Sequence, residues 1–261
     1  MIDARRGVLY PARMPEFRRI RPPQGAVDLV EWFWIPEWDI ERGRSSRQHV
    51  VAYPALNLVV GPEAVELTGA TTRAGFRDLT GRGWAVGALL RPAAVCALVG
   101  NPSALVDTSE TVDAPELQDA VTRAMRGEER HAGAVAAVSA WLVRRVGPLT
   151  PVAVQANEMA DLLMTDATIL RAEDAAARLR MSLRTLQRMT HRHVGLPPAA
   201  MIRRRRLQEA AQRIRDDPGA DLARIAAELG YADHSHLTND FRAVLGVSPR
   251  AYRADQRPAD R

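Results

Sequence analysis

The feature that most constrains this chain is a pattern that occurs twice between Ile169 and Tyr252. Each copy reads as a short helix, a tight turn, a second amphipathic helix, and then a glycine followed by a proline. The first copy covers roughly 173–197 and the second roughly 222–249. This order of elements is that of a helix-turn-helix unit. Two such units in tandem predict an all-α domain in the last third of the chain.

The residues at the two turns support this interpretation. Ser182 and Asp233 each stand directly before the second helix of their unit, where a side-chain oxygen can accept a hydrogen bond from the first turn. Gly230 stands at the turn of the second unit and tolerates a positive φ. We therefore expect a helix N-cap at Ser182 and Asp233, and a left-handed residue at Gly230.

In a DNA-binding unit of this kind, the second helix lies in the major groove and turns its apolar side to the protein core. Arginine can chelate a guanine edge, and glutamine or asparagine an adenine edge. The alternative is that these polar side chains form solvated helix faces. The candidate DNA-binding residues are Ser182, Arg184, Thr185, Gln187, Arg188, Arg192, Arg203, Arg204, His234, Ser235, His236, Thr238, Asn239 and Arg242.

The segment 197–214 joins the two units and includes four consecutive arginines, residues 203–206. As a helix of ~18 residues it would be ~27 Å long, which can hold two recognition helices about one DNA turn apart. The four arginines cannot all face one way on a helix. We expect one or two to meet phosphates and the others to pair with acids such as Glu209 or to stay solvated.

Charge is unevenly distributed along the chain. Residues 168–261 carry 18 Arg against 11 acidic residues, a net charge of +7, whereas residues 1–167 carry 18 Arg against 20, a net charge of −2. A basic domain beside a near-neutral one is typical of a polyanion-binding module attached to a second function. The absence of lysine can also reflect a GC-rich genome, so the arginine usage by itself does not indicate phosphate binding.

The first 167 residues show a different organisation. Short apolar runs broken by turn residues predict strands at 27–35, 50–52, 56–60, 65–68 and 84–90, and helical spacing predicts helices at 93–99, 116–125, 132–146 and 152–164. The expected fold is thus α+β with two domains. A β-rich domain with a helical C-terminal part covers 1–167, and an all-α domain of two helix-turn-helix units joined by a linker helix covers 168–261.

The C-terminal segment resembles the DNA-binding domain of the AraC/XylS family of transcription regulators. The resemblance is carried by the run from Ile225 to Asp233, by Phe241, by the turn 246–249, and in the first copy by residues 186–188 and Gly195. The chain departs from the family pattern in two places, where a common phenylalanine is Thr190 and a common aromatic is Leu237. Thr190 places a polar group at an expected core position, so Thr190→Phe should stabilise the domain if the site has room.

The N-terminal half resembles, less closely, the β-rich domain of uncharacterised AraC-type regulators, through Phe33-Trp34, the run 54–59, Gly81–Trp84 and Arg91-Pro92. The resemblance implies a sensor or dimerisation domain, with a cupin-like fold as one possibility. The resemblance therefore leaves open whether this domain binds a small-molecule effector and whether the chain forms a homodimer. The candidate effector-binding residues are Trp32, Trp34 and His49, and core packing is the alternative for the tryptophans.

Several classes of protein are disfavoured. The one cysteine, Cys96, lies in an apolar run that favours a buried core residue, and it rules out both a cysteine zinc site and a disulfide. The histidine pairs are two residues apart on predicted helices and point in different directions, so we expect no metal. No nucleotide loop or nucleophile elbow is present, so we expect no cofactor and no enzyme. We also expect neither a signal peptide nor a membrane span.

Three hypotheses remain open at this stage. The first is a cytoplasmic, sequence-specific regulator that binds double-stranded DNA and responds to an effector, with RNA polymerase as an open further partner. The second is a DNA-binding protein that needs no effector and whose N-terminal domain only dimerises. The third, which the sequence disfavours, is an unrecognised enzyme with a DNA-binding tail.

Overall fold

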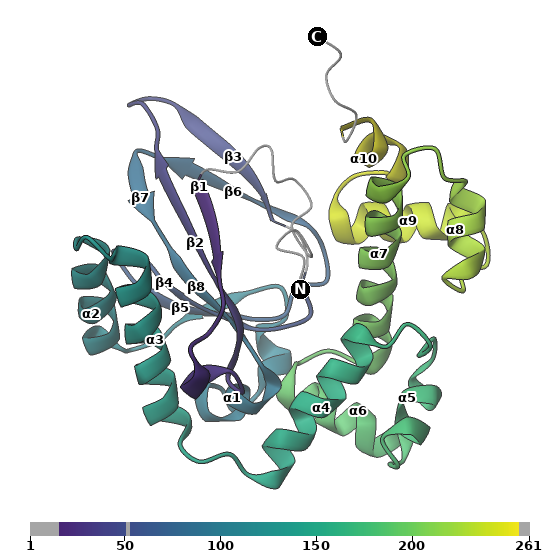
Figure 1. Cartoon of the computed structure of the whole chain (residues 1–261), viewed down its shortest axis with the longest axis horizontal. Helices are drawn as coiled ribbons and strands as arrows, with labels where there is room; N and C mark the ends of the chain where they lie inside the picture. The colour runs from purple at the N-terminus through teal and green to yellow at the C-terminus, as the bar shows by residue number, and fades with distance from the viewer. Residues whose placement is uncertain (1–15, 51–52, 256–261) are drawn as a thin grey trace.

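The computed structural model describes residues 16–50 and 53–255, and it has a β-rich N-terminal part and an all-α C-terminal part (Figure 1). A long helix, α7, lies upright in the C-terminal part of this view, with the remaining C-terminal helices at its two ends. The two-domain α+β fold expected from the sequence is confirmed.

The N-terminal part contains a seven-stranded antiparallel sheet and a separate two-stranded antiparallel sheet. The strand order in the larger sheet is β1-β2-β8-β4-β5-β9, with β7 also paired to β2, and the smaller sheet pairs β3 with β6. The central strand β8 is buried along its whole length, which explains its continuous apolar sequence. The strands are β1 (Glu16–Ile20), β2 (Val30–Asp39), β3 (Ser45–Val50), β4 (Asn57–Val60), β5 (Val65–Thr68), β6 (Gly75–Thr80), β7 (Arg82–Trp84), β8 (Val86–Leu90) and β9 (Ser109–Thr111).

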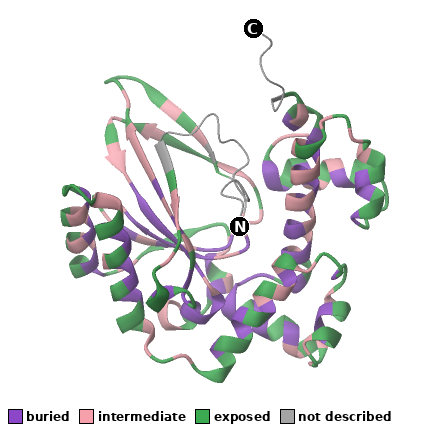
Figure 2. Ribbon diagram, viewed as in Figure 1, coloured by how far each residue is buried: buried purple, intermediate pink, exposed green. Residues whose placement is uncertain are grey.

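Two long helices, α2 (Pro115–Met125) and α3 (Arg130–Val146), pack on this sheet and close the first core. Within β2, the alternation of side chains sends Phe33 and Ile35 into that core, where both are fully buried. The short elements η1 (Gln24–Ala26), α1 (Pro92–Leu98) and η2 (Pro102–Leu105) connect the strands. Figure 2 shows the buried residues concentrated where the sheet meets these helices.

The C-terminal part is helical throughout. Its helices are α4 (Pro151–Thr165), α5 (Ala172–Arg178), α6 (Leu183–His193), α7 (Pro198–Asp216), α8 (Leu222–Glu228), α9 (His234–Leu245) and α10 (Pro249–Asp255). The expected linker helix is therefore present as α7, whose 19 residues span about 28 Å at the usual rise of about 1.5 Å per residue.

Two hydrophobic cores lie at opposite ends of α7. The second half of α7 packs with α8, α9 and α10 through residues such as Ile214, Phe241 and Tyr252. The first half packs with α5 and α6, and α4 contributes Met159 and Leu163 to the same core. Helix α4, which the sequence assigned to the N-terminal domain, thus shares its core with the first helix-turn-helix unit.

The sequence located most of these elements but missed five strands wholly or almost wholly. All four helices expected before residue 167 are present within two residues of their expected ends. β1, β6 and β9 were not expected at all, and only the last residue of β3 and of β7 falls in an expected strand. β6 and β9 gave no signal because their described residues are largely exposed and their sequences are polar. The strand expected at 27–35 begins at Val30 and runs on to Asp39. Of the strand expected at 50–52, Val51 and Ala52 lie outside the described residues.

Candidate nucleic-acid interface

The two helix-turn-helix units have the same backbone turn. In the first, Met181 N–H donates to the Ala176 carbonyl at 3.0 Å, and in the second Tyr231 N–H donates to the Ala226 carbonyl at 2.9 Å. The residue before each donor is left-handed, with φ 53° at Arg180 and 72° at Gly230. The positive φ expected at Gly230 is confirmed. That at Arg180 was missed, because its side chain gives no signal for this conformation.

Both second helices begin with the expected side-chain cap. The Ser182 hydroxyl accepts from Thr185 N–H at 3.1 Å, and an Asp233 carboxylate oxygen accepts from His236 N–H at 2.8 Å. The hydrogen bond from His236 N–H lowers the pKa of Asp233, whose carboxylate therefore stays charged at the positive end of α9. The two recognition helices, α6 and α9, thus start in the same way.

The outward faces of α6 and α9 are polar and exposed. Leu186 and Leu237 hold equivalent positions on the inner faces, and neither is exposed to solvent. Of the candidate residues on these helices, Thr185 and Thr238 are half-buried, Ser182 is exposed at its cap, and the others are exposed. The exposed ones on the helices are Arg184, Gln187, Arg188, Arg192, His234, Ser235, His236, Asn239 and Arg242.

The arginines of α7 do not form a free basic stripe. Arg203 forms an ion pair with Asp240 of α9 at 2.7 Å, and the Arg206 guanidinium lies 3.9 Å from the centre of the Tyr231 ring. Arg205 is buried and donates to the Ile169 carbonyl at 2.5 Å. These partners hold α7 against the helices on either side of it.

Arg204 turns in the opposite direction, toward the N-terminal domain. Its side chain is 4% exposed, and its guanidinium lies 5.6 Å from the Tyr53 ring centre. Burial lowers the pKa of Arg204 to about 10, so it is still charged at neutral pH. Arg204 therefore lies away from any surface that DNA could reach in this structure.

The N-terminal domain contacts the C-terminal end of the first recognition helix. The buried His193 ring places Nδ1 3.1 Å from the Pro92 carbonyl oxygen. A Cβ on Gly195, whose φ is 87°, would come within 2.7 Å of the Pro102 carbonyl oxygen, so the backbones there are in close contact. At the end of α9, the Ala243 carbonyl accepts from Ala74 N–H at 3.2 Å. The N-terminal halves of α6 and α9 lie away from these contacts, and their outward side chains are exposed to solvent.

Helix α4 completes this contact, which we call the domain seam. Asn157 is 5% exposed, and its side chain accepts from Ala93 N–H and donates to the Asp28 carbonyl, both at 2.9 Å. Arg91 pairs with Asp161 of the same helix at 2.7 Å. One buried side chain thus satisfies two backbone groups of the N-terminal domain.

Cys96 corrects an expectation. It is an exposed residue on α1 and not a core residue, and its Sγ lies 3.4 Å from His193 Nδ1 across the seam. The interaction with His193 lowers the pKa of the Cys96 thiol, with burial opposing it. The apolar run around Cys96 favoured burial, but its partner stands 97 residues later, which no local pattern can reveal.

Trp32 and Trp34, two of the three candidate effector residues, each contact a neighbouring side chain. Trp32 is stacked by Arg19, whose guanidinium lies 3.5 Å from the ring centre. Trp34 donates through its indole N–H to the Asn57 side chain at 2.9 Å and packs over Gly87. The backbone of His49 lies in β3, and its side chain lies outside what the structure describes.

Among the residues that the structure describes, no three or more His, Cys, Asp or Glu side chains come together in a way that suits a metal ion. None of the described helices combines the length and the hydropathy that crossing a bilayer requires.

Comparison with known families places both halves of the chain. Residues 175–255 match a helix-turn-helix domain family, and residues 18–111 match a domain of unknown function, DUF6597. The chain is 38% identical over 81 residues to the HTH-type transcriptional activator RhaS of Escherichia fergusonii, covering 31% of this chain and 29% of that protein. It is 41% identical over 83 residues to the HTH-type transcriptional regulator VirS of Mycobacterium tuberculosis, covering 32% and 24%.

The chain therefore spans less than a third of the length of these curated relatives. Among solved structures, ToxT of Vibrio cholerae aligns with 92% of this chain and 96% of its own, at 12% identity and a TM-score of 0.41. Both relatives matched at the C-terminal end are HTH-type regulators of transcription. The C-terminal third of this chain is therefore an AraC-type DNA-binding domain, joined to a β-rich N-terminal domain of a family whose function is unknown.

Proposed function

We propose that this protein is a sequence-specific regulator of transcription that binds two successive major grooves of one DNA duplex. The observation that carries the proposal is the matched pair of recognition helices. α6 and α9 start from the same turn and cap, and they lie at opposite ends of one 19-residue helix. In Figure 1, α5 and α8 project to the same side of α7, away from the sheet.

The proposed base-reading residues lie on the outward faces of these helices. Arg188 and Asn239 each stand six residues after their N-cap, so they hold equivalent positions. Arginine there suits a guanine and asparagine an adenine. The rest of the proposed interface, for base edges and phosphates together, is Ser182, Arg184, Thr185, Gln187, Arg192, Arg203, His234, Ser235, His236, Thr238 and Arg242. Arg204 is left out because it is buried against the N-terminal domain.

Selection of randomised duplexes by the full chain tests the proposal. We expect an enriched site with two conserved segments, and an affinity that falls steeply with salt because phosphate contacts release counterions. Arg145→Ala serves as a control, because Arg145 is exposed at the end of α3 and far from both recognition helices in sequence. Salt-sensitive binding without any enriched sequence would instead support an architectural DNA-binding protein.

We further propose that the N-terminal domain senses a small-molecule effector. The support is its position, since it touches the end of a recognition helix through a seam of buried polar contacts. The alternative is an effector-independent protein whose N-terminal domain only dimerises. A homodimer and a contact with RNA polymerase are further proposals of the same kind. A regulator of this type acts where chromosomal DNA is found, which for a bacterium is the cytoplasm.

A further inference from the structure

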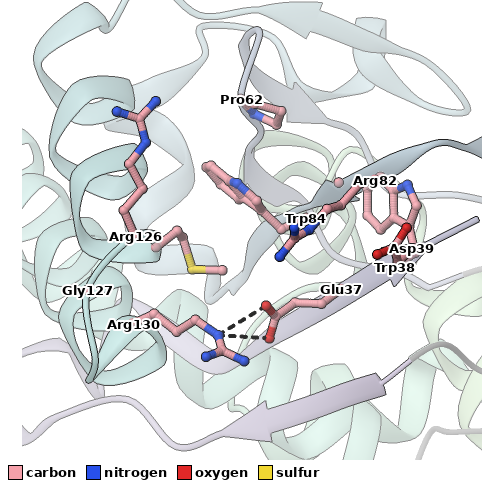
Figure 3. Close-up of a pocket in the computed structure, with 11 residues that line it drawn as sticks. Glu37, Trp38, Asp39, Pro62, Arg82, Trp84, Arg126, Gly127 and Arg130 are labelled. Atoms are coloured by element: carbon pink, nitrogen blue, oxygen red, sulfur yellow. Dashed lines mark hydrogen bonds and ion pairs between the residues drawn. The ribbon is translucent and has the colours of Figure 1, made fainter.

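A cleft opens on the N-terminal domain on the side of the sheet that α2 and α3 cover. It lies between the end of β2, strand β7, the turn at Pro62 and the corner between α2 and α3 (Figure 3). Its volume is about 740 Å³, within the range of roughly 300–1,000 Å³ that is usual for small-molecule sites. None of its residues was among the effector candidates expected from the sequence.

Apolar and aromatic side chains line part of the cleft. The Trp84 indole is half-buried, and Met125 at the end of α2 is 8% exposed. Trp38 lies across Gly83, where a Cβ would come within 2.5 Å of its ring, and its indole N–H donates to the Thr80 carbonyl at 3.2 Å. The contacts with Gly83 and Thr80 hold the Trp38 ring in place. An aromatic surface of this kind suits a flat ligand, because the tryptophan side chain loses little freedom when the ligand binds.

The acidic group nearest the centre of the cleft is already neutralised. Glu37 accepts from Arg130 Nε at 3.1 Å (Figure 3). It also accepts from His131 Nε2 at 2.6 Å. Burial by itself would raise the pKa of Glu37, but the hydrogen bonds from His131 and Arg130 outweigh it and lower this pKa. Glu37 is thus a satisfied carboxylate and offers little attraction to a cationic ligand.

Two other arginines of the cleft have no such partner. Arg82 and Arg126 are exposed, and no ion pair joins either of them to the residues that the structure describes. In Figure 3, Arg82 reaches from β7 toward Trp84 and Glu37, and Arg126 extends from the end of α2 on the other side. With Asp39 as the remaining acid, three arginines face two carboxylates around the cleft. The side chains that line the cleft therefore carry a net positive charge.

We propose that this cleft binds a small aromatic carboxylate. The ring lies against Trp84 and Met125, and the carboxylate pairs with Arg82, which Figure 3 shows turned toward Trp84, while Arg126 on the other side of the cleft adds positive charge. A guanidinium group matches a carboxylate in geometry and in charge. The inference deepens the proposal that the N-terminal domain is a sensor, since it gives that sensor a site and a ligand class.

Calorimetric titration of the full chain with naphthalenecarboxylate, in the absence of DNA, tests the assignment. The neutral naphthalenecarboxamide and the cationic naphthylmethylammonium have the same ring and different charge. We expect saturable binding of the carboxylate and affinities at least about tenfold weaker for both analogues. The double variant Arg82→Ala/Arg126→Ala should weaken carboxylate binding by about tenfold or more. Arg123→Ala, which removes an exposed arginine of α2 that does not line the cleft, should change it less than about twofold.

Three results would overturn the proposal. These are no binding of the carboxylate up to about 5 mM, equal binding of the three compounds, or equal loss in the double variant and in Arg123→Ala. Preference for the ammonium compound would reverse the assigned charge of the ligand. Because DNA is absent, each of these results leaves the DNA-binding proposal standing, which the duplex selection tests separately. Thermal unfolding of each variant shows that it is folded before titration.

Discussion

Single residues show where local sequence decides the structure and where it does not. The caps at Ser182 and Asp233 could be predicted because each acts on the backbone three residues later. The left-handed Arg180 could not, because its conformation comes from the turn and not from its own side chain. Cys96 and Arg204 were misjudged for a related reason: their partners His193 and Tyr53 are distant in sequence.

Arg180→Gly should stabilise the C-terminal domain. A residue with a Cβ in the left-handed region is strained by roughly 1–2 kcal/mol, and glycine relieves this at a smaller entropic cost, leaving a gain of about 0.5–1 kcal/mol. Gly230→Ala at the equivalent turn should cost about 1 kcal/mol, although a Cβ there would make only ordinary contacts, with Leu170 at 3.5 Å and Arg206 at 3.9 Å. Urea unfolding measures both, and changes of the same sign in the two variants would contradict the strain argument.

Thr190 holds the position in α6 that Phe241 holds in α9, and both are fully buried. The Thr190 hydroxyl already donates to the Gln187 carbonyl at 3.0 Å, so its polar group is satisfied. Thr190→Phe should therefore destabilise by about 1–3 kcal/mol through overpacking, contrary to the gain expected from the sequence. Thr190→Val nearly keeps the volume and removes one intramolecular hydrogen bond, so it should change stability by no more than about 1.5 kcal/mol. A more stable phenylalanine variant would show that the core has space at this site.

At the scale of elements, periodicity located the helices well because each buries one face, but it could not assign a helix to a core. Helix α4 follows α3 after a short turn, and its sequence fits either domain. The structure packs its Ala156, Met159 and Leu163 with α5, α6 and α7. The polar strand β6 was missed because it pairs only with β3 and is largely exposed, so burial leaves no alternation in its sequence.

This packing predicts that fragment 148–261 is more stable than fragment 168–261. Loss of one buried leucine or methionine side chain typically costs about 2–5 kcal/mol, and the shorter fragment loses one of each. We expect the shorter fragment to be less stable by at least about 3 kcal/mol, and to show partial unfolding of α5 and α6 by circular dichroism. Equal unfolding midpoints of the two fragments would mean that α4 does not stabilise the C-terminal domain, and would support the domain boundary expected at residue 167.

At the scale of the whole molecule, the seam joins the N-terminal domain to α4 and to the end of α6 through polar contacts. Asn157→Leu should destabilise the full chain by about 2–4 kcal/mol, because it leaves the buried Ala93 N–H and the Asp28 carbonyl without their partner and places an apolar side chain against them. In fragment 148–261, which lacks both partners, the same substitution should change stability by less than about 0.5 kcal/mol. Gln155→Ala, at an exposed position of α4, is the matched control. Equal effects in chain and fragment would mean that Asn157 does not act across the seam.

The central claim is that α6 and α9 read two successive turns of one DNA duplex. The most direct measurement is selection of randomised duplexes with the full chain, with Arg188→Ala and with Asn239→Ala. Each variant should lose preference at one base position at a cost of about 1–3 kcal/mol, and the two positions should lie about ten base pairs apart. Binding to unrelated sequences should stay nearly unchanged in both. Equal weakening on every sequence, or loss of preference at adjacent positions, would contradict this account.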